Sequence, residues 1–143
     1  LDYGFLQYMG HGADLIWLYF YLQKLSLLMS LSMFTTTNLY LEPGEKRFDA
    51  LIETISDGVY ITELVGLHAG VKAISGEFSL QASGFKIENG KVTYPVNMIV
   101  VSGNFFDVMN AIEGFANDLK FDVSGFGSPS VYVKSLSISG ESK

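Results

Sequence analysis

The dipeptide Asn89-Gly90, set between two β-favouring runs, constrains this chain more than any other local feature. Asn and Gly adopt the positive φ angles that a two-residue type I′ turn requires, and such a turn folds one strand back onto the next. The chain is therefore predicted to form a tight antiparallel hairpin between Ile87-Glu88 and Lys91-Val92. Pro95 cannot donate a hydrogen bond to a sheet, so its strand is predicted to lie at an edge or to break there.

Further strands are predicted on both sides of this hairpin. Runs that mix β-branched and aromatic residues favour strands, and they occupy residues 59–65, 77–84, 97–101, 119–123 and 131–138. In the last run the apolar positions change phase between Val133 and Leu136. A single strand can do this only through a bulge or twist, which we expect near Lys134-Ser135.

Two short amphipathic helices are predicted between the strands. The second is expected to begin after Asn104, because asparagine is a favourable N-cap residue. Apolar residues recur at helical spacing in both segments. The apolar faces are Phe48, Leu51, Ile52 and Ile55 in the first, and Phe105, Val108, Met109 and Ile112 in the second. The predicted fold class is α+β: a mostly antiparallel β-sheet with two short amphipathic helices covering one face.

Residues 1–34 differ in composition from the rest of the chain, because residues 15–34 are almost wholly apolar or small. A helix of that length would reach across a bilayer. However, Lys24 lies near its centre, where a lone lysine costs about 2.5–3.5 kcal/mol. We therefore favour an apolar helix that is buried or packed on a partner over a membrane segment, and natively unstructured sequence is a third alternative. The predicted division is an apolar segment, 1–34, followed by one domain, 35–143.

Charge and composition exclude several classes of function. The net charge of −6 argues against non-specific nucleic-acid binding, which requires a basic surface. Cysteine is absent, so neither a disulfide framework nor a thiolate zinc site can form, and a cytoplasmic location fits this composition.

The sequence offers no evident hydrolytic zinc site. Such a site needs about three protein ligands and an open position for water. The chain has only two histidines, His11 and His68, and neither begins an H-E-x-x-H helix. A site formed by His68, Glu63 and a distant carboxylate is less favoured than a loop histidine without a metal. We therefore predict no metal-ligating residue.

Nucleophilic catalysis is not predicted either. The segment 125–129, Gly-Phe-Gly-Ser-Pro, lacks the G-x-S-x-G spacing of a nucleophile elbow and is interpreted as a loop before the final strand. Asp118 and Asp122 stand at even spacing in a predicted strand, so both are expected to face solvent. No catalytic residue is therefore predicted.

A series of short sequence motifs resembles one known family when their order and spacing are taken together. The motifs are 37–45 (TNLYLEPGE), 57–64 (DGVYITEL), 66–71 (GLHAGV), 75–80 (SGEFSL), 82–85 (ASGF), 87–90 (IENG), 94–96 (YPV), 102–104 (SGN), 117–119 (NDL) and 127–130 (GSPS). Over residues 35–140 the chain resembles the carboxy-terminal region of the TldD/PmbA family, also known as modulators of DNA gyrase.

This resemblance implies a cytoplasmic, heterodimeric metalloprotease that admits unfolded peptide segments and trims them. In the TldD-type subunit zinc is held by a histidine motif upstream of this region and by a late cysteine. The corresponding segment here, 123–130, has no cysteine. It therefore resembles the PmbA (TldE) type of subunit, which supports its partner without holding metal. No cofactor is expected in this chain, and zinc is expected only in a TldD-type partner.

The chain also departs from the family pattern. The large amino-terminal region of the family is missing, and residues 1–34 do not resemble the segment expected there. We therefore expect a truncated or frameshifted gene product.

Two functional hypotheses follow. In the first, the chain is a non-catalytic subunit or carboxy-terminal fragment of a TldD/PmbA-type metalloprotease. It would associate with a TldD-type subunit or with further copies of itself, and with unfolded peptide. The residues expected to face peptide or partner are His68, Gly70, Ser75, Gly76, Phe78, Gly103 and Asn104. In the second, it is a stand-alone β-rich interaction module that self-associates through residues 15–34. Neither hypothesis includes a membrane partner.

The shortage of metal donors gives a direct prediction. We expect the purified chain to retain no stoichiometric zinc after dialysis, because two histidines and no cysteine supply too few strong ligands. Elemental analysis checks this. Tightly bound zinc, or chelator-sensitive peptide cleavage by the chain alone, would contradict it.

Overall fold

The computed structural model describes residues 6–8, 39–66, 69–72, 74–121 and 126–140. The elements are β1 (Leu6–Tyr8), β2 (Leu39–Tyr40), α2 (Phe48–Glu53), β3 (Asp57–Val65), β4 (Glu77–Glu88), β5 (Lys91–Asn104), α3 (Phe105–Asn110), β6 (Ile112–Phe115), β7 (Lys120–Phe121), β8 (Phe126–Ser128), β9 (Val131–Val133) and β10 (Ser137–Ser139). The apolar helix predicted within residues 15–34 lies outside the described residues.

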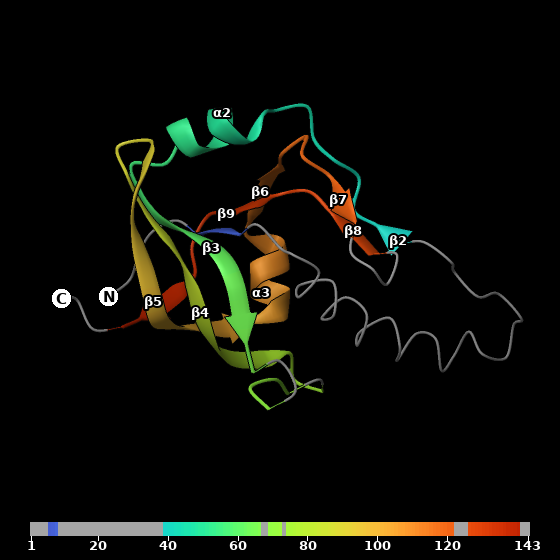
Figure 1. Cartoon of the computed structure of the whole chain (residues 1–143). Coiled ribbons are helices and arrows are strands. Elements are labelled where there is room, and N and C mark those ends of the chain that lie inside the picture. The colour runs from blue at the N-terminus through green and yellow to red at the C-terminus, as the bar shows by residue number, and fades with distance from the viewer. Residues whose placement is uncertain (1–5, 9–38, 67–68, 73, 122–125, 141–143) are drawn as a thin grey trace, which may run out of the picture.

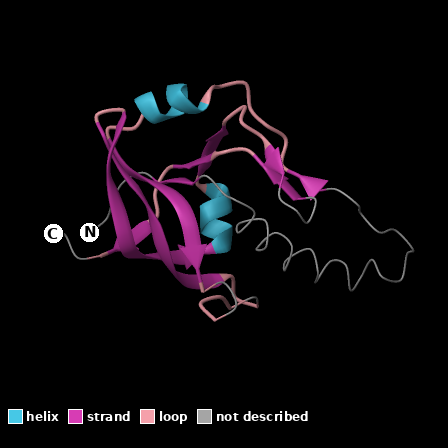
Figure 2. Ribbon diagram, in the orientation of Figure 1, coloured by secondary structure: helices cyan, strands magenta, loops and turns pink. Residues whose placement is uncertain are grey.

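The strands form two sheets. The larger has seven strands in the order β10-β5-β4-β3-β1-β9-β6, and the smaller has the order β2-β8-β7. Only β1–β3 and β2–β8 are parallel pairs, and the remaining pairs are antiparallel. Figures 1 and 2 show the long strands β3, β4 and β5 curving together as the main body of the sheet. The prediction of a mostly antiparallel sheet with two short helices is confirmed.

The predicted hairpin joins the two longest strands, β4 and β5. Asn89 and Gly90 have φ angles of 50° and 74°, as a turn with two left-handed residues requires. Their amides donate to the carbonyl oxygens of Ser56 and Ile55, each at 2.8 Å. The turn is thus bonded to the segment that follows α2.

β5 is irregular around Pro95. We call the side of β5 that faces away from β4 its outer side. Pro95 pairs with Phe85, and the register between β4 and β5 shifts on both sides of this pair. Met98 lies within one of these register shifts and has a φ of 55°, which is uncommon for a residue other than glycine. Among the described strands, β10 alone pairs with the outer side of β5, and only at Val100–Ser102. The predicted edge position of Pro95 is therefore confirmed.

Two apolar clusters stabilise the main sheet. Because side chains alternate along a strand, Val59 and Ile61 of β3 enter one cluster and Tyr60 enters the other. The first cluster is Val59, Ile61, Ala82, Ile99, Val101 and Ile138, and the second is Leu51, Ile52, Ile55, Tyr60, Ile87, Ala116 and Tyr132. The apolar face of α2 thus packs where the sequence predicted, although Ile55 lies just beyond the end of the helix.

Tyr60 lies at the centre of an aromatic group in the second cluster. Its ring centroid is 5.2 Å from that of Phe48 and 6.3 Å from that of Phe85. Burial raises the pKa of Tyr60, and the negative charge of Asp118 adds to this effect. Burial likewise raises the pKa of Tyr132. Both hydroxyls are therefore stabilised in their neutral form by the fold.

Two sequence predictions about the elements were wrong. Ile112 does not continue the second helix, because α3 ends at Asn110 and Ile112 begins β6. The two helices lie at opposite ends of the β4–β5 hairpin: α2 lies by the turn, whereas α3 follows the far end of β5 (Figure 1). The apolar phase change after Val133 is not a bulge, because residues 131–133 and 137–139 are separate strands that pair with different neighbours.

The segment before β9 was also predicted incompletely. Among the described residues β7 covers Lys120–Phe121, so the predicted strand 119–123 does not include Leu119, and its residues 122–123 lie outside the described part of the chain. The segment interpreted as a loop before the final strand contains β8, which pairs with β2 and β7. Pairing in a second small sheet has no strong local signal in such short segments.

Gly84 in β4 gives a test of the packing between β3 and β4. A Cβ atom at Gly84 would lie 1.9 Å from the carbonyl oxygen of Tyr60, so Gly84→Ala forces the two strands apart. We expect it to lower the free energy of unfolding by about 2 kcal/mol or more. Gly114→Ala in β6 is the matched control, because its nearest neighbour is a Leu51 methyl group at 3.8 Å. Denaturant unfolding of both variants checks this, and equal effects would contradict it.

Candidate functional site

The residues predicted to face peptide or partner gather at one end of the main sheet. Gly70, Ser75, Gly76 and Phe78 belong to the connection between β3 and β4 and to the start of β4. Gly103 and Asn104 end β5, directly beside them, because Phe78 pairs with Gly103 and Glu77 pairs with Asn104. We call this group the β3–β4 loop cluster. The seventh predicted residue, His68, lies outside the described residues.

Gly70 holds the loop close to the sheet. Its amide donates to the carbonyl oxygen of Gly66 at 2.8 Å, and its own carbonyl oxygen accepts from the Ser79 amide at 2.8 Å. A Cβ atom at Gly70 would lie 2.2 Å from the Ser79 carbonyl oxygen. Only glycine permits this backbone approach, so Gly70 can lie directly against Ser79 of β4.

Asn104 bonds the loop to α3. Its side-chain oxygen accepts from the Phe106 amide at 2.9 Å, which confirms the predicted N-cap. Its side-chain nitrogen donates to the Ser75 carbonyl oxygen at 2.9 Å. The Phe105 amide donates to the Gly76 carbonyl oxygen at 2.8 Å. One asparagine therefore joins the turn, the strand end and the helix start.

Charged groups on the loop neutralise one another. Lys72 Nζ lies 2.8 Å from Glu77 Oε2, and Ser75 Oγ donates to the same oxygen at 3.3 Å. The hydrogen bond to Lys72 lowers the pKa of Glu77, and the same bond raises the pKa of Lys72. Both side chains are exposed, so this pair adds little to stability. It leaves a loop surface of low net charge.

The loop also displays apolar surface. Ile74 is 89% exposed and directly precedes Ser75, whose carbonyl oxygen accepts from the Asn104 side chain. The Gly76 amide donates to the Lys72 carbonyl oxygen at 2.8 Å, which closes the turn around Ile74. The described part of the loop therefore presents one large apolar side chain to solvent.

The described residues do not fit a zinc ion. Within the described part of the chain, no three or more His, Asp or Glu side chains gather closely enough to hold a metal. Among the described residues of the loop, the Ser75 hydroxyl hydrogen-bonds to the Glu77 carboxylate, and no histidine pairs with it there.

A polar pair that the sequence did not predict joins Asp118, which precedes β7, to Ser130, which lies between β8 and β9. The Ser130 amide and hydroxyl donate to the two carboxylate oxygens of Asp118, at 2.7 and 2.6 Å. Ser130 is 1% exposed. The prediction that Asp118 faces solvent from a strand was wrong, since it precedes β7 and bonds to the segment before β9. Asp122 lies outside the described residues.

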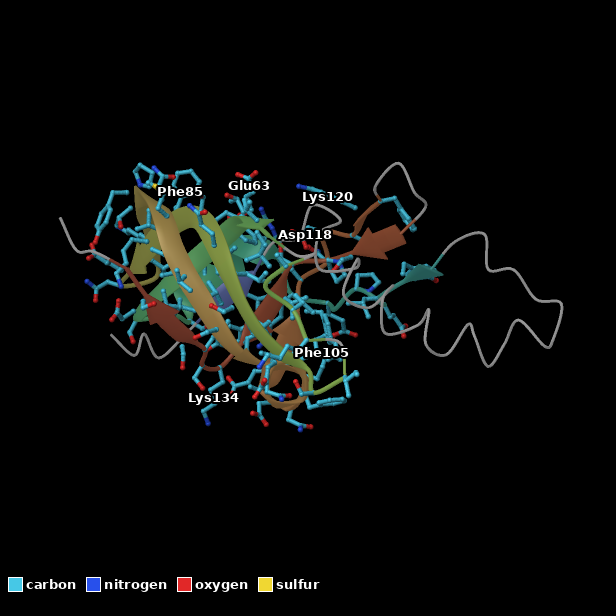
Figure 3. All side chains as sticks on the ribbon, turned by 90° about the horizontal axis from the view of Figure 1, so that it is seen from below. Glu63, Phe85, Phe105, Asp118, Lys120 and Lys134 are labelled. Carbon is cyan, nitrogen blue, oxygen red and sulfur yellow. The ribbon has the colours of Figure 1, made fainter. Side chains whose placement is uncertain are left out.

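This pair has a structural role. The Ala116 amide donates to the Ser130 carbonyl oxygen at 2.8 Å, so the two segments are bonded at several points. A carboxylate that accepts two hydrogen bonds is well compensated for its partial burial. Figure 3 shows Asp118 and Lys120 together, well away from Phe105 at the start of α3. The pair is thus separate from the β3–β4 loop cluster.

The described helices are short. None of them combines the length and apolar character needed to cross a bilayer.

The described residues form a mostly antiparallel β-rich fold with two short helices, and the sequence of the chain matches a metallopeptidase domain. Residues 25–140 match the family described as the PmbA/TldA metallopeptidase C-terminal domain. The chain therefore belongs to the PmbA/TldD metallopeptidase family.

Relatives of known sequence and structure agree with this assignment. The chain is 35% identical over 94 residues to the metalloprotease PmbA of Escherichia coli O157:H7, and 30% identical over 122 residues to the zinc metalloprotease TldD homolog of Saccharolobus solfataricus. A candidate modulator of a DNA gyrase from Thermotoga maritima has a crystal structure that superposes with a TM-score of 0.68 at 45% identity. TldE from Thermococcus kodakarensis shares the fold, with a TM-score of 0.65 at 20% identity.

The chain spans only part of these proteins. The match covers 66% of this chain and 20% of the Escherichia coli protein, and 76% of this chain and 27% of the Saccharolobus protein. For the Thermotoga and Thermococcus structures it covers 71% of this chain and 24% and 23% of theirs. The matched region is thus about a fifth to a quarter of each relative.

The role of Asn104 can be tested by truncation. We expect Asn104→Ala to lower the free energy of unfolding by about 1 kcal/mol, because the N-cap of α3 and the bond to Ser75 are both lost. Asn110→Ala, at the exposed end of the same helix, is the matched control. Hydrogen exchange should also rise at the amides of residues 75 and 76 in Asn104→Ala alone. Identical exchange in both variants would contradict this account.

Proposed function

We propose that the chain is a non-catalytic part of a PmbA/TldD-type metallopeptidase and binds extended peptide at the β3 end of its sheet. Hydrolysis belongs to a zinc-bearing TldD-type partner, as the resemblance implies. The observation that carries the proposal is that none of the described strands pairs with Glu63–Val65 on the β1 side of β3, next to the β3–β4 loop cluster. The family assignment supports it, since the relatives are metalloproteases.

The side of β3 that faces β1 is only partly paired. β1 pairs with Val59–Ile61, whereas β4 pairs with β3 as far as Val65. Among the described strands, none pairs with Glu63–Val65 on the β1 side. This edge continues directly into the loop that carries Gly70 and Ile74. An extended peptide can add to such an edge through main-chain hydrogen bonds, whatever its sequence.

The other edges of the main sheet suit peptide addition less well. On β5, Pro95 lacks an amide hydrogen, and register shifts lie on both sides of it. On β6, the Gly44 amide donates to the Ala116 carbonyl oxygen, and the Asn117 amide donates to the Lys46 carbonyl oxygen. These contacts occupy backbone groups at the end of β6. The β3 edge is therefore the favoured one.

Side chains beside the β3 edge determine its charge and its apolar surface. Glu63 and Val65 are both exposed, and Val65 is 49% exposed. Figure 3 shows Glu63 on the same side of the sheet as Phe85, opposite Phe105 and Lys134. A mixed surface of one carboxylate and apolar groups, beside a loop of low net charge, fits unfolded segments of varied sequence. The proposal thus predicts broad rather than strict selectivity.

The β3 edge can be blocked by charge. We expect Val65→Lys to weaken binding of unfolded peptide to the complex of this chain with a TldD-type protein, by about tenfold, because charged side chains obstruct strand addition. Val92→Lys is the matched control: Val92 is 42% exposed and lies by the hairpin turn. Co-purification shows whether the complex forms, and fluorescence titration with a labelled unfolded peptide gives the affinity.

Two outcomes would overturn the proposal. A monomeric chain that does not co-purify with a TldD-type protein would exclude the subunit role. Equal affinities for the Val65→Lys and Val92→Lys complexes would exclude the β3 edge as the binding surface. Unfolding midpoints of both variants establish that each remains folded.

A further inference from the structure

We infer that Asn89 is a site of spontaneous deamidation, and that docking of the α2 segment on the hairpin turn sets its rate. Asn89 is exposed and is followed by Gly90, which has no side chain to hinder attack on the asparagine amide. Asparagine is among the chemically labile residues of proteins. The inference concerns the hairpin turn and does not depend on the proposed peptide-binding function.

The reaction needs only water. The Gly90 backbone nitrogen loses its proton to solvent and attacks Cγ of Asn89, forming a new N–C bond. The bond from Cγ to Nδ2 breaks, and ammonia leaves with a proton from solvent. Water then opens the resulting succinimide at one of its two carbonyl carbons. Opening at Cγ gives aspartate, and opening at the backbone carbonyl gives isoaspartate, so the net change is hydrolysis of one amide.

The fold restrains the attacking nitrogen. The Gly90 amide donates to the Ile55 carbonyl oxygen at 2.8 Å, and the Asn89 amide donates to the Ser56 carbonyl oxygen at 2.8 Å. The first bond keeps the proton on the nucleophile and directs the nitrogen toward residue 55. Attack on Asn89 Cγ requires this bond to break, so the docked turn is protected.

The protecting segment is held by α2. Ile52 is 5% exposed and Ile55 is fully buried, and both pack with Ile87 just before the turn. A Cβ atom at Gly90 would lie 2.9 Å from the Glu53 carbonyl oxygen, so the end of the helix contacts the turn directly. Weakening the packing of α2 should expose Gly90 without opening the first apolar cluster.

The two products differ in their effect on the fold. Aspartate keeps the backbone path and adds one charge at an exposed position. Isoaspartate diverts the backbone through Cβ and Cγ, which lengthens a turn already in contact with Glu53. Isoaspartate therefore displaces the end of α2 from the hairpin, and the second apolar cluster loses part of its cover.

The test compares folded chain, peptide and two matched variants. Ammonia release and isoaspartate at residue 89 are followed by peptide mass mapping at mildly alkaline pH, with Asn89→Asp as the blank. We expect the folded chain to react about tenfold or more slowly than a synthetic peptide of residues 85–94. Ile52→Val should react about two- to tenfold faster than the unmodified chain. Ile138→Val, in the first apolar cluster, should stay within about twofold of it.

Two other patterns of deamidation rates would contradict the inference. Equal rates in folded chain and peptide would show that docking gives no protection. Equal acceleration by Ile52→Val and Ile138→Val would show that global unfolding, rather than release of α2, controls the reaction. If Ile52→Val does not fold, hydrogen exchange of the Gly90 amide in the unmodified chain is measured instead. The exchange rate and the deamidation rate should then show the same weak dependence on denaturant concentration. A strong dependence, typical of global unfolding, would overturn the inference.

Discussion

The reversal of the chain at Asn89-Gly90 is the constraint on which the remaining architecture depends. Two successive residues with positive φ bring β4 and β5 together in a single register. Because side chains alternate along each strand, this register decides which residues enter each apolar cluster. It also determines what lies at the two ends of the hairpin: α2 at the turn, and the β3–β4 loop cluster with α3 at the far end (Figure 1).

Features with local causes could be predicted from the sequence. The turn at Asn89-Gly90, the apolar face of α2 and the N-cap at Asn104 each arise from interactions within a few residues. Features with distant causes could not. The separation of residues 131–138 into β9 and β10 depends on partners in β1, β6 and β5, and no local pattern distinguishes a crossover from a bulge. The bond between Asp118 and Ser130 likewise joins residues that only the folded chain brings together.

The grouping of the β3–β4 loop cluster at one end of the sheet follows from strand pairing, whereas its role in binding stays a prediction. Six of its residues could be singled out through the family resemblance, and pairing of β4 with β5 brings them together. Their physical roles depend on contacts that exist only in the folded chain. Gly70 permits a close backbone approach, Asn104 joins loop to helix, and Gly76 adopts a left-handed conformation with a φ of 76°. Nor was it evident that, among the described strands, β1 pairs with β3 only at Val59–Ile61, because strand length alone does not reveal which residues a neighbour pairs with.

The irregular outer side of β5 has a consequence for the behaviour of the chain in a crowded cell. A regular strand of 14 residues at a sheet margin would offer a ready template for cross-β stacking between copies. Pro95 interrupts that template with a missing donor, and Met98 turns the backbone out of the pleat. The two kinks thus act as a built-in safeguard against fibril growth on the side of β5 that faces away from β4.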